Sequence, residues 1–178
     1  MHKWFSEWKK WLVHGLLVCG AAPMVHAFTL SNGETVQCEV SLNGRAGVAT
    51  EIWVNYTDIK DRHPELGRAV AVMRPDAQGW PTIILDAEAF KRTGKGTPAI
   101  WDFVYFHECA HAQQPQLGEI GANCAAYVDM ERRGLMSYHR YKEIEAVHLS
   151  MMSLPMEYGG SGPQFWHQTL QCAKKGKE

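Results

Sequence analysis

The chain of 178 residues lacks several features that would place it in whole classes of protein. It has no basic stripe, only a short lysine-containing tail at residues 174–177, and this argues against an extended surface for nucleic acid. None of its five cysteines forms a C-x-x-C pair, which argues against a zinc site built from cysteines. It also has no internal repeat, biased tract or linker, so we expect a single domain.

Long apolar runs are also missing, apart from one near the N-terminus. Three lysines precede an apolar stretch at residues 11–25, which is too short and too interrupted for a comfortable membrane span. A small-residue cleavage signal ends at Ala27, so residues 1–27 are predicted to be a signal peptide and residues 28–178 the mature domain. We expect an exported protein, periplasmic or secreted, without stable membrane insertion after cleavage. An uncleaved anchor or a lipid on Cys19 is the alternative.

Removal of the signal peptide would leave four cysteines, and an even number in an exported protein predicts two disulfides. Three connectivities are possible. We expect Cys109–Cys124, which would join two neighbouring helices, and Cys38–Cys172, which would close a long loop. The alternative is that one pair consists of buried thiols.

The most informative segment is the H-E-x-x-H motif at residues 107–111. Residues four apart lie on the same face of a helix, so His107 and His111 can both reach one metal ion. Glu108, about 100° round the helix, can reach a water molecule held on that ion. This is the arrangement of zinc hydrolases.

Helix-boundary signals surround the motif. Thr97 before Pro98 is typical of an N-cap followed by proline at the first helical position, and Pro115 ends the segment. A second helix is predicted over residues 117–133, with Gly134 as a left-handed residue that terminates it. The two helices would form an antiparallel pair.

Glu119, near the start of the second helix, would face His111 across the turn between the helices. A longer signature that continues with G-x-x-H is excluded, because Gln114 and Leu117 occupy the required positions. Asn123 lies one turn beyond Glu119 on the same face and can hydrogen-bond a ligating histidine.

The segments HECAH and GEIGANCAA, within residues 103–136, resemble small bacterial zinc metallopeptidases of the gluzincin type. In that family a second helix carries a ligating glutamate, often with an aspartate four residues later that orients a histidine. The resemblance implies one zinc ion with three protein ligands: His107, His111 and Glu119. It implies Glu108 as the general base, and Asn123 stands where the family usually has aspartate.

The segment before the motif is predicted to form a sheet. β-Branched and aromatic residues gather in four runs: 35–40, 49–57, 69–73 and 80–86. Pro81 favours an edge position for the last strand. Zincin-type peptidases generally hold the substrate backbone against an edge strand above the metal, and residues 80–86 are our candidate for that strand.

Further helices are predicted over residues 138–152 and 164–173. The expected fold is therefore α+β and zincin-like: a mostly antiparallel N-terminal sheet, the H-E-x-x-H helix, the ligand helix and C-terminal helices.

These observations predict an exported, monomeric zinc endopeptidase that hydrolyses peptide bonds by a zinc-activated water, with Glu108 as general base. Its partner would be a peptide or protein substrate. The alternatives are a zinc-dependent amidase acting on cell-wall cross-links and a non-catalytic binding protein stabilised by zinc. A second donor for the developing oxyanion is also expected. The C-terminal candidates are His139, His148, Tyr158 and His167.

Overall fold

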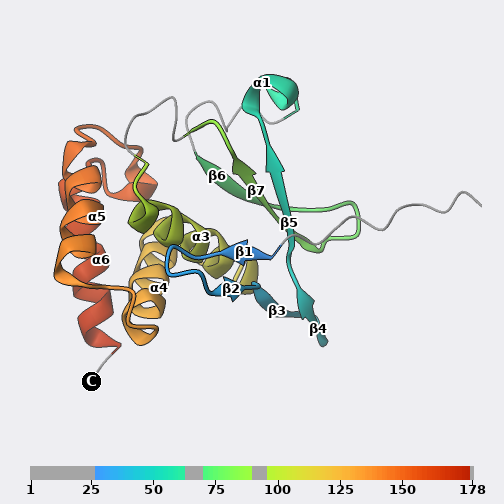
Figure 1. Ribbon diagram of the computed structural model, residues 1–178, viewed down its shortest axis with the longest axis horizontal. Coiled ribbons are helices and arrows are strands. Elements are labelled where there is room, and N and C mark those ends of the chain that lie inside the picture. The colour runs from blue at the N-terminus through green and yellow to red at the C-terminus, as the bar shows by residue number, and fades with distance from the viewer. Residues whose placement is uncertain (1–26, 63–69, 90–95, 177–178) are drawn as a thin grey trace, which may run out of the picture.

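The computed structural model describes residues 27–62, 70–89 and 96–176 (Figure 1). The predicted signal peptide, apart from Ala27, and the possible lipid site at Cys19 lie outside these residues. Both therefore stay predictions.

Strands dominate the first half of the described chain, and they form three small sheets. Two are antiparallel hairpins: β1 (Phe28–Thr29) with β2 (Thr35–Val36), and β3 (Glu39–Leu42) with β4 (Arg45–Val48). The third sheet has the order β5-β7-β6, with β5 at Thr50–Val54, β6 at Ala71–Pro75 and β7 at Pro81–Asp86.

Helices dominate the second half. They are α3 (Pro98–Gln113), α4 (Glu119–Arg132), α5 (Tyr138–Ser150), the short 3-10 helix η2 (Met156–Tyr158) and α6 (Gly162–Lys175). One short helix, α1 (Tyr56–Ile59), lies in the first half between β5 and β6. The α+β class is thus confirmed. Among the described residues, no helix is long and apolar enough to span a membrane.

The position of β7 differs from the prediction, because β7 is the central strand of its sheet and not an edge. It pairs in parallel with β5 and antiparallel with β6. Pro81 is compatible with this position because it is the first residue of the strand. The run Ile83-Ile84-Leu85 is almost fully buried, which is typical of a strand covered on both faces. The edges are therefore β5 and β6.

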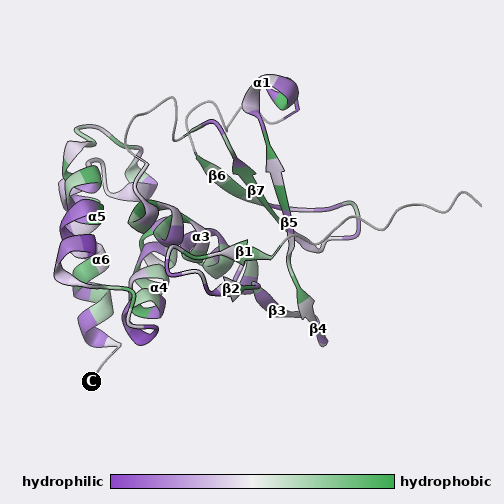
Figure 2. Ribbon diagram, in the orientation of Figure 1, coloured by the Kyte–Doolittle hydropathy of each residue, from purple (hydrophilic) through white to green (hydrophobic). Residues whose placement is uncertain are grey.

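Helix α3 lies between the strands and the other long helices (Figure 1). The Thr97 side chain caps it by accepting a hydrogen bond from the backbone N–H of Ile100, and Pro98 follows as predicted. Hydrophobic colour runs along β7 and α3, while the outer helices α5 and α6 are largely hydrophilic (Figure 2). The core thus encloses α3 and fixes the helix that carries the motif.

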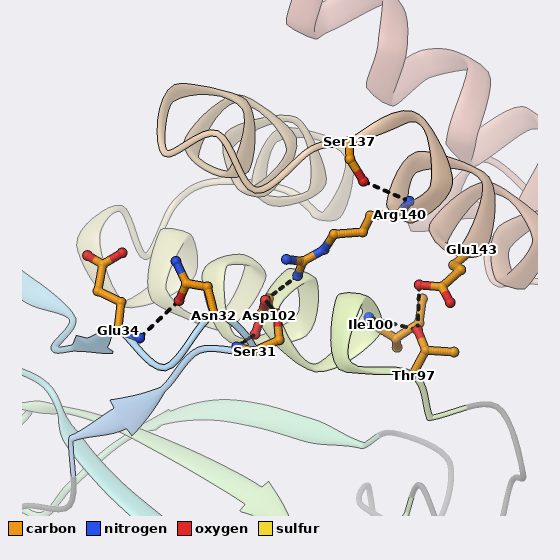
Figure 3. Close-up of polar contacts among 9 residues, drawn as sticks. All are labelled: Ser31, Asn32, Glu34, Thr97, Ile100, Asp102, Ser137, Arg140 and Glu143. Carbon is orange, nitrogen blue, oxygen red and sulfur yellow. Dashed lines mark hydrogen bonds and ion pairs between the residues drawn. The ribbon is translucent and has the colours of Figure 1, made fainter.

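A polar cross-link anchors the start of α3 (Figure 3). Asp102 is 1% exposed and accepts hydrogen bonds from the Ser31 backbone N–H at 3.0 Å and from the Ser31 hydroxyl at 2.5 Å. Arg140 of α5 forms an ion pair with the same carboxylate. This buried charge is paired, and it joins the β1–β2 turn, α3 and α5.

All four cysteines of the described residues form disulfides, as predicted, but the expected pairing is wrong. The bonds are Cys38–Cys109 and Cys124–Cys172. Cys109 lies two residues from His107, about 200° round the helix, so it faces away from α4 when the histidines face toward it. Cys109 therefore meets the segment between β2 and β3, and Cys124 meets α6. Two disulfides are compatible with an extracellular protein.

Candidate metal centre

The structure brings together the three residues predicted as ligands. One donor atom from each of His107, His111 and Glu119 lies within 4.8 Å of the others. A single carboxylate oxygen, Glu119 Oε2, is 3.1 Å from His107 Nε2 and 3.5 Å from His111 Nε2. Two imidazole nitrogens and a carboxylate are a ligand set of catalytic zinc sites, so the residues fit a zinc ion.

Two helices and a short turn produce this convergence. His107 and His111 project from one face of α3, and their ring centroids are 4.9 Å apart. The chain reverses after α3 through a turn in which Leu117 N–H donates to the carbonyl of Gln114 at 2.8 Å. Glu119 is the first residue of α4, so its side chain lies opposite the last turns of α3.

The electrostatics of the cluster favour a charged glutamate. Burial raises the pKa of the Glu119 carboxyl, but hydrogen bonds from His107 and His111 outweigh burial and hold that pKa well below its usual range. The hydrogen bond between His111 and Glu119 also raises the pKa of His111. An anionic oxygen facing two imidazoles is thus the stable state of the site.

Glu108 is beside the cluster but is not part of it. Its side chain is buried, and burial raises the pKa of its carboxyl above the ordinary value. The backbone N–H of Met73 in β6 donates a hydrogen bond to it. Glu108 therefore lies between the candidate ligands and an edge strand of the sheet.

Asn123 makes the contact that its position in the sequence predicted. Its Oδ1 is 3.1 Å from His107 Nδ1, on the side of the ring away from Glu119. Asn123 is 2% exposed, so this is an internal contact. Asn123 thus orients His107, although the family that the sequence resembles usually has aspartate at this position.

Of the four candidates for a second donor, Tyr158 is the one that the structure places against the cluster. Its hydroxyl is hydrogen-bonded to Glu119, and burial together with the Glu119 charge raises the pKa of Tyr158. His139 is largely exposed and pairs with Glu143. The other two lie elsewhere: His148 in the core beside Asn123, and His167 on the surface beside Gln171.

Sequence reasoning missed two contributors to the site. Met73 acts through its backbone, which no residue pattern can reveal. Thr169 of α6 lies 3.1 Å from Asn123 Nδ2 but is 46 residues further along the chain and in no motif. Only the tertiary fold brings these groups to α3 and α4.

Comparison of the chain with protein-family models, with curated proteins and with solved structures finds no match.

Proposed function

We propose that the chain is an exported zinc-dependent endopeptidase of the gluzincin type. The observation that carries this proposal is a buried carboxyl, Glu108, beside a three-residue ligand cluster that does not include it. A structural zinc site is usually closed by four protein ligands and has no use for an additional base. A catalytic site needs three ligands and a base.

Each residue of the site would have a separate role in the reaction. His107, His111 and Glu119 would hold the ion. Zinc would supply Lewis acidity, which polarises a carbonyl and lowers the pKa of water. Glu108 would accept a proton from the attacking water at its carboxylate and deliver it to the leaving amine. The raised pKa makes this carboxylate a stronger base, and the Met73 N–H keeps it in place.

Two neighbouring features favour a peptide as the substrate. Within the described part of the chain, strand β6 pairs only with β7, so its other edge can add an extended peptide by backbone hydrogen bonding. This strand takes the role predicted for β7, because Met73 of β6 contacts Glu108. Tyr158 is protonated at neutral pH, since the ordinary pKa of tyrosine is about 10 and the pKa of Tyr158 is raised further, so it can donate to a developing oxyanion.

Digestion of a mixed peptide library by the zinc-reconstituted protein tests the proposal. Wild type should cleave, and Glu108→Gln should lower the rate at least about 100-fold without loss of zinc, because the variant lacks only the base. Glu39→Gln, which changes an exposed glutamate of β3, should cleave like wild type. Equal cleavage by Glu108→Gln would refute the role of the base. Zinc binding without any cleavage would indicate a non-peptide amide substrate or a structural ion.

A further inference from the structure

We propose that His148 and Thr169 are positioning residues that fix the amide orientation of Asn123 and thereby keep a proton on His107 Nδ1, so that Nε2 is the nitrogen that binds metal. This inference rests on the proposed metal site but not on the reaction. It assigns a role to two buried polar residues outside the ligand cluster.

Asn123 is the centre of this network. Its Nδ2 is 3.0 Å from His148 Nε2 and 3.1 Å from Thr169 Oγ1, and its Oδ1 is 3.1 Å from His107 Nδ1. Asn123, His148 and Thr169 are all buried, so water cannot easily replace a mismatched partner.

The direction of each hydrogen bond follows from two backbone carbonyls at the ends of the network. His148 Nδ1 lies 2.8 Å from the carbonyl of Ile144, which can only accept, so Nδ1 carries the proton and Nε2 of the neutral ring is an acceptor. The Thr169 hydroxyl donates to the carbonyl of Phe165 at 2.9 Å, so its oxygen lone pairs face Asn123.

Two acceptors therefore face one end of the Asn123 amide. That end must be the NH₂ group, because the reverse orientation would place a carbonyl oxygen against both acceptors. Oδ1 then faces His107, whose Nδ1 must donate. Nδ1 therefore carries a proton whether or not Nε2 does. Nε2 is the atom directed at Glu119, to which it donates a hydrogen bond when no metal is bound, and once that proton is released its lone pair can bind a metal ion.

The surroundings of His148 keep it neutral, as this polarity requires. The rings of Phe103, Phe165 and Trp166 pack around it, with centroids 4.7 to 5.6 Å away. Burial lowers the pKa of His148 to about 4. The family that the sequence resembles usually has aspartate at the position of Asn123. An ionised aspartate can only accept hydrogen bonds, so it could not pair with the acceptors His148 Nε2 and Thr169 Oγ1. The NH₂ group of Asn123 can donate to both.

The test measures the protonation of His107 Nδ1 and the affinity for zinc in the full-length protein. Long-range ¹H–¹⁵N spectra of the zinc-free protein should show His107 protonated on Nδ1. Thr169→Val and His148→Phe each remove one acceptor, so each should lower the fraction of His107 that carries a proton on Nδ1 and weaken zinc binding about 10-fold or more. A chromophoric chelator in competition with the protein measures that affinity.

Matched variants separate positioning from general damage. Thr169→Ser keeps the hydroxyl and should retain the Nδ1 protonation and the affinity of wild type. His167→Phe removes an exposed histidine from the same helix and should change neither. If His148→Phe does not fold, the comparison of Thr169→Val with Thr169→Ser still decides the outcome.

Two results would overturn the inference: a His107 Nδ1 without a proton in the zinc-free wild type, or folded Thr169→Val and His148→Phe variants with unchanged Nδ1 protonation and zinc affinity. A different result would refute the proposed peptidase activity. In that case the variants would change the zinc affinity and the protonation of His107 as expected, while no peptide is cleaved.

Discussion

Glu51 is a fully buried carboxyl outside the candidate metal site, and its environment predicts a pH dependence of stability. Its Oε1 accepts a hydrogen bond from the Tyr105 hydroxyl at 2.8 Å. Burial raises the pKa of Glu51 in the folded state, and the hydrogen bonds from Tyr105 and from the Cys38 and Phe28 backbones only partly oppose it. The unfolded chain therefore releases this proton at lower pH than the folded protein does.

The Glu51 carboxyl should consequently destabilise the fold as the pH rises above its unfolded pKa, about 4.3. Glu51→Gln removes this titration. We expect the free energy of unfolding of Glu51→Gln to increase relative to wild type between pH 4 and pH 7. Chemical denaturation at each pH measures it, with the exposed Glu39→Gln as control. A difference that stays constant or shrinks as the pH rises would contradict the assignment.

At this same scale, local spacing explains which site residues could be predicted. His107, Glu108 and His111 share two helical turns, and Glu119 follows after a short turn, so their proximity depends on local geometry alone. Tyr158 was one of four equivalent candidates, because only tertiary packing distinguishes it from the histidines.

At the scale of elements, Gly162 controls the contact between α5 and α6. A Cβ added there would lie 1.8 Å from the carbonyl oxygen of His148, whereas one added at Gly176 would meet nothing closer than 3.9 Å. Gly162→Ala must therefore force the end of α5 away from the start of α6. We expect a loss of about 3 kcal/mol or more in the free energy of unfolding.

Gly176→Ala, at the other end of the same helix, is the matched control and should change stability by less than about 0.5 kcal/mol. Urea denaturation of both variants measures the difference. Equal denaturation midpoints for the two variants would mean that α5 and α6 can move apart without a loss of stability. Because α5 carries His148 and α6 carries Thr169, we also expect Gly162→Ala to weaken zinc binding.

Helix boundaries could be predicted well because caps are local signals: Thr97 and Gly134 act where the sequence placed them. Strand order could not, since it depends on partners far along the chain. Pro81 suggested an edge, although proline at the first position of a strand leaves the ladder intact. The continuous apolar run after it indicated the central position more reliably.

At the scale of the whole molecule, the two disulfides and the candidate metal site connect the layers in series. Cys38–Cys109 joins the strands to α3, the ligand cluster joins α3 to α4, and Cys124–Cys172 joins α4 to α6. The expected Cys109–Cys124 bond would have duplicated the connection that the ligands already make. The Cys109–Cys124 bond does not form, because α3 cannot direct both its histidines and Cys109 toward α4.

This arrangement predicts the linked peptides and their contribution to stability. No lysine or arginine lies between Cys109 and Cys124, so digestion must also cleave after glutamate, including Glu119. Mass spectrometry without reduction should then find Cys38 linked to Cys109 and Cys124 linked to Cys172. A Cys109–Cys124 link would contradict the fold.

The bonded residues are 71 and 48 positions apart, so loop-closure entropy predicts that replacing either pair by alanine lowers the free energy of unfolding by about 4 kcal/mol. Similar losses for both pairs would mean that the two disulfides contribute equally to holding α3 and α4 in the fold.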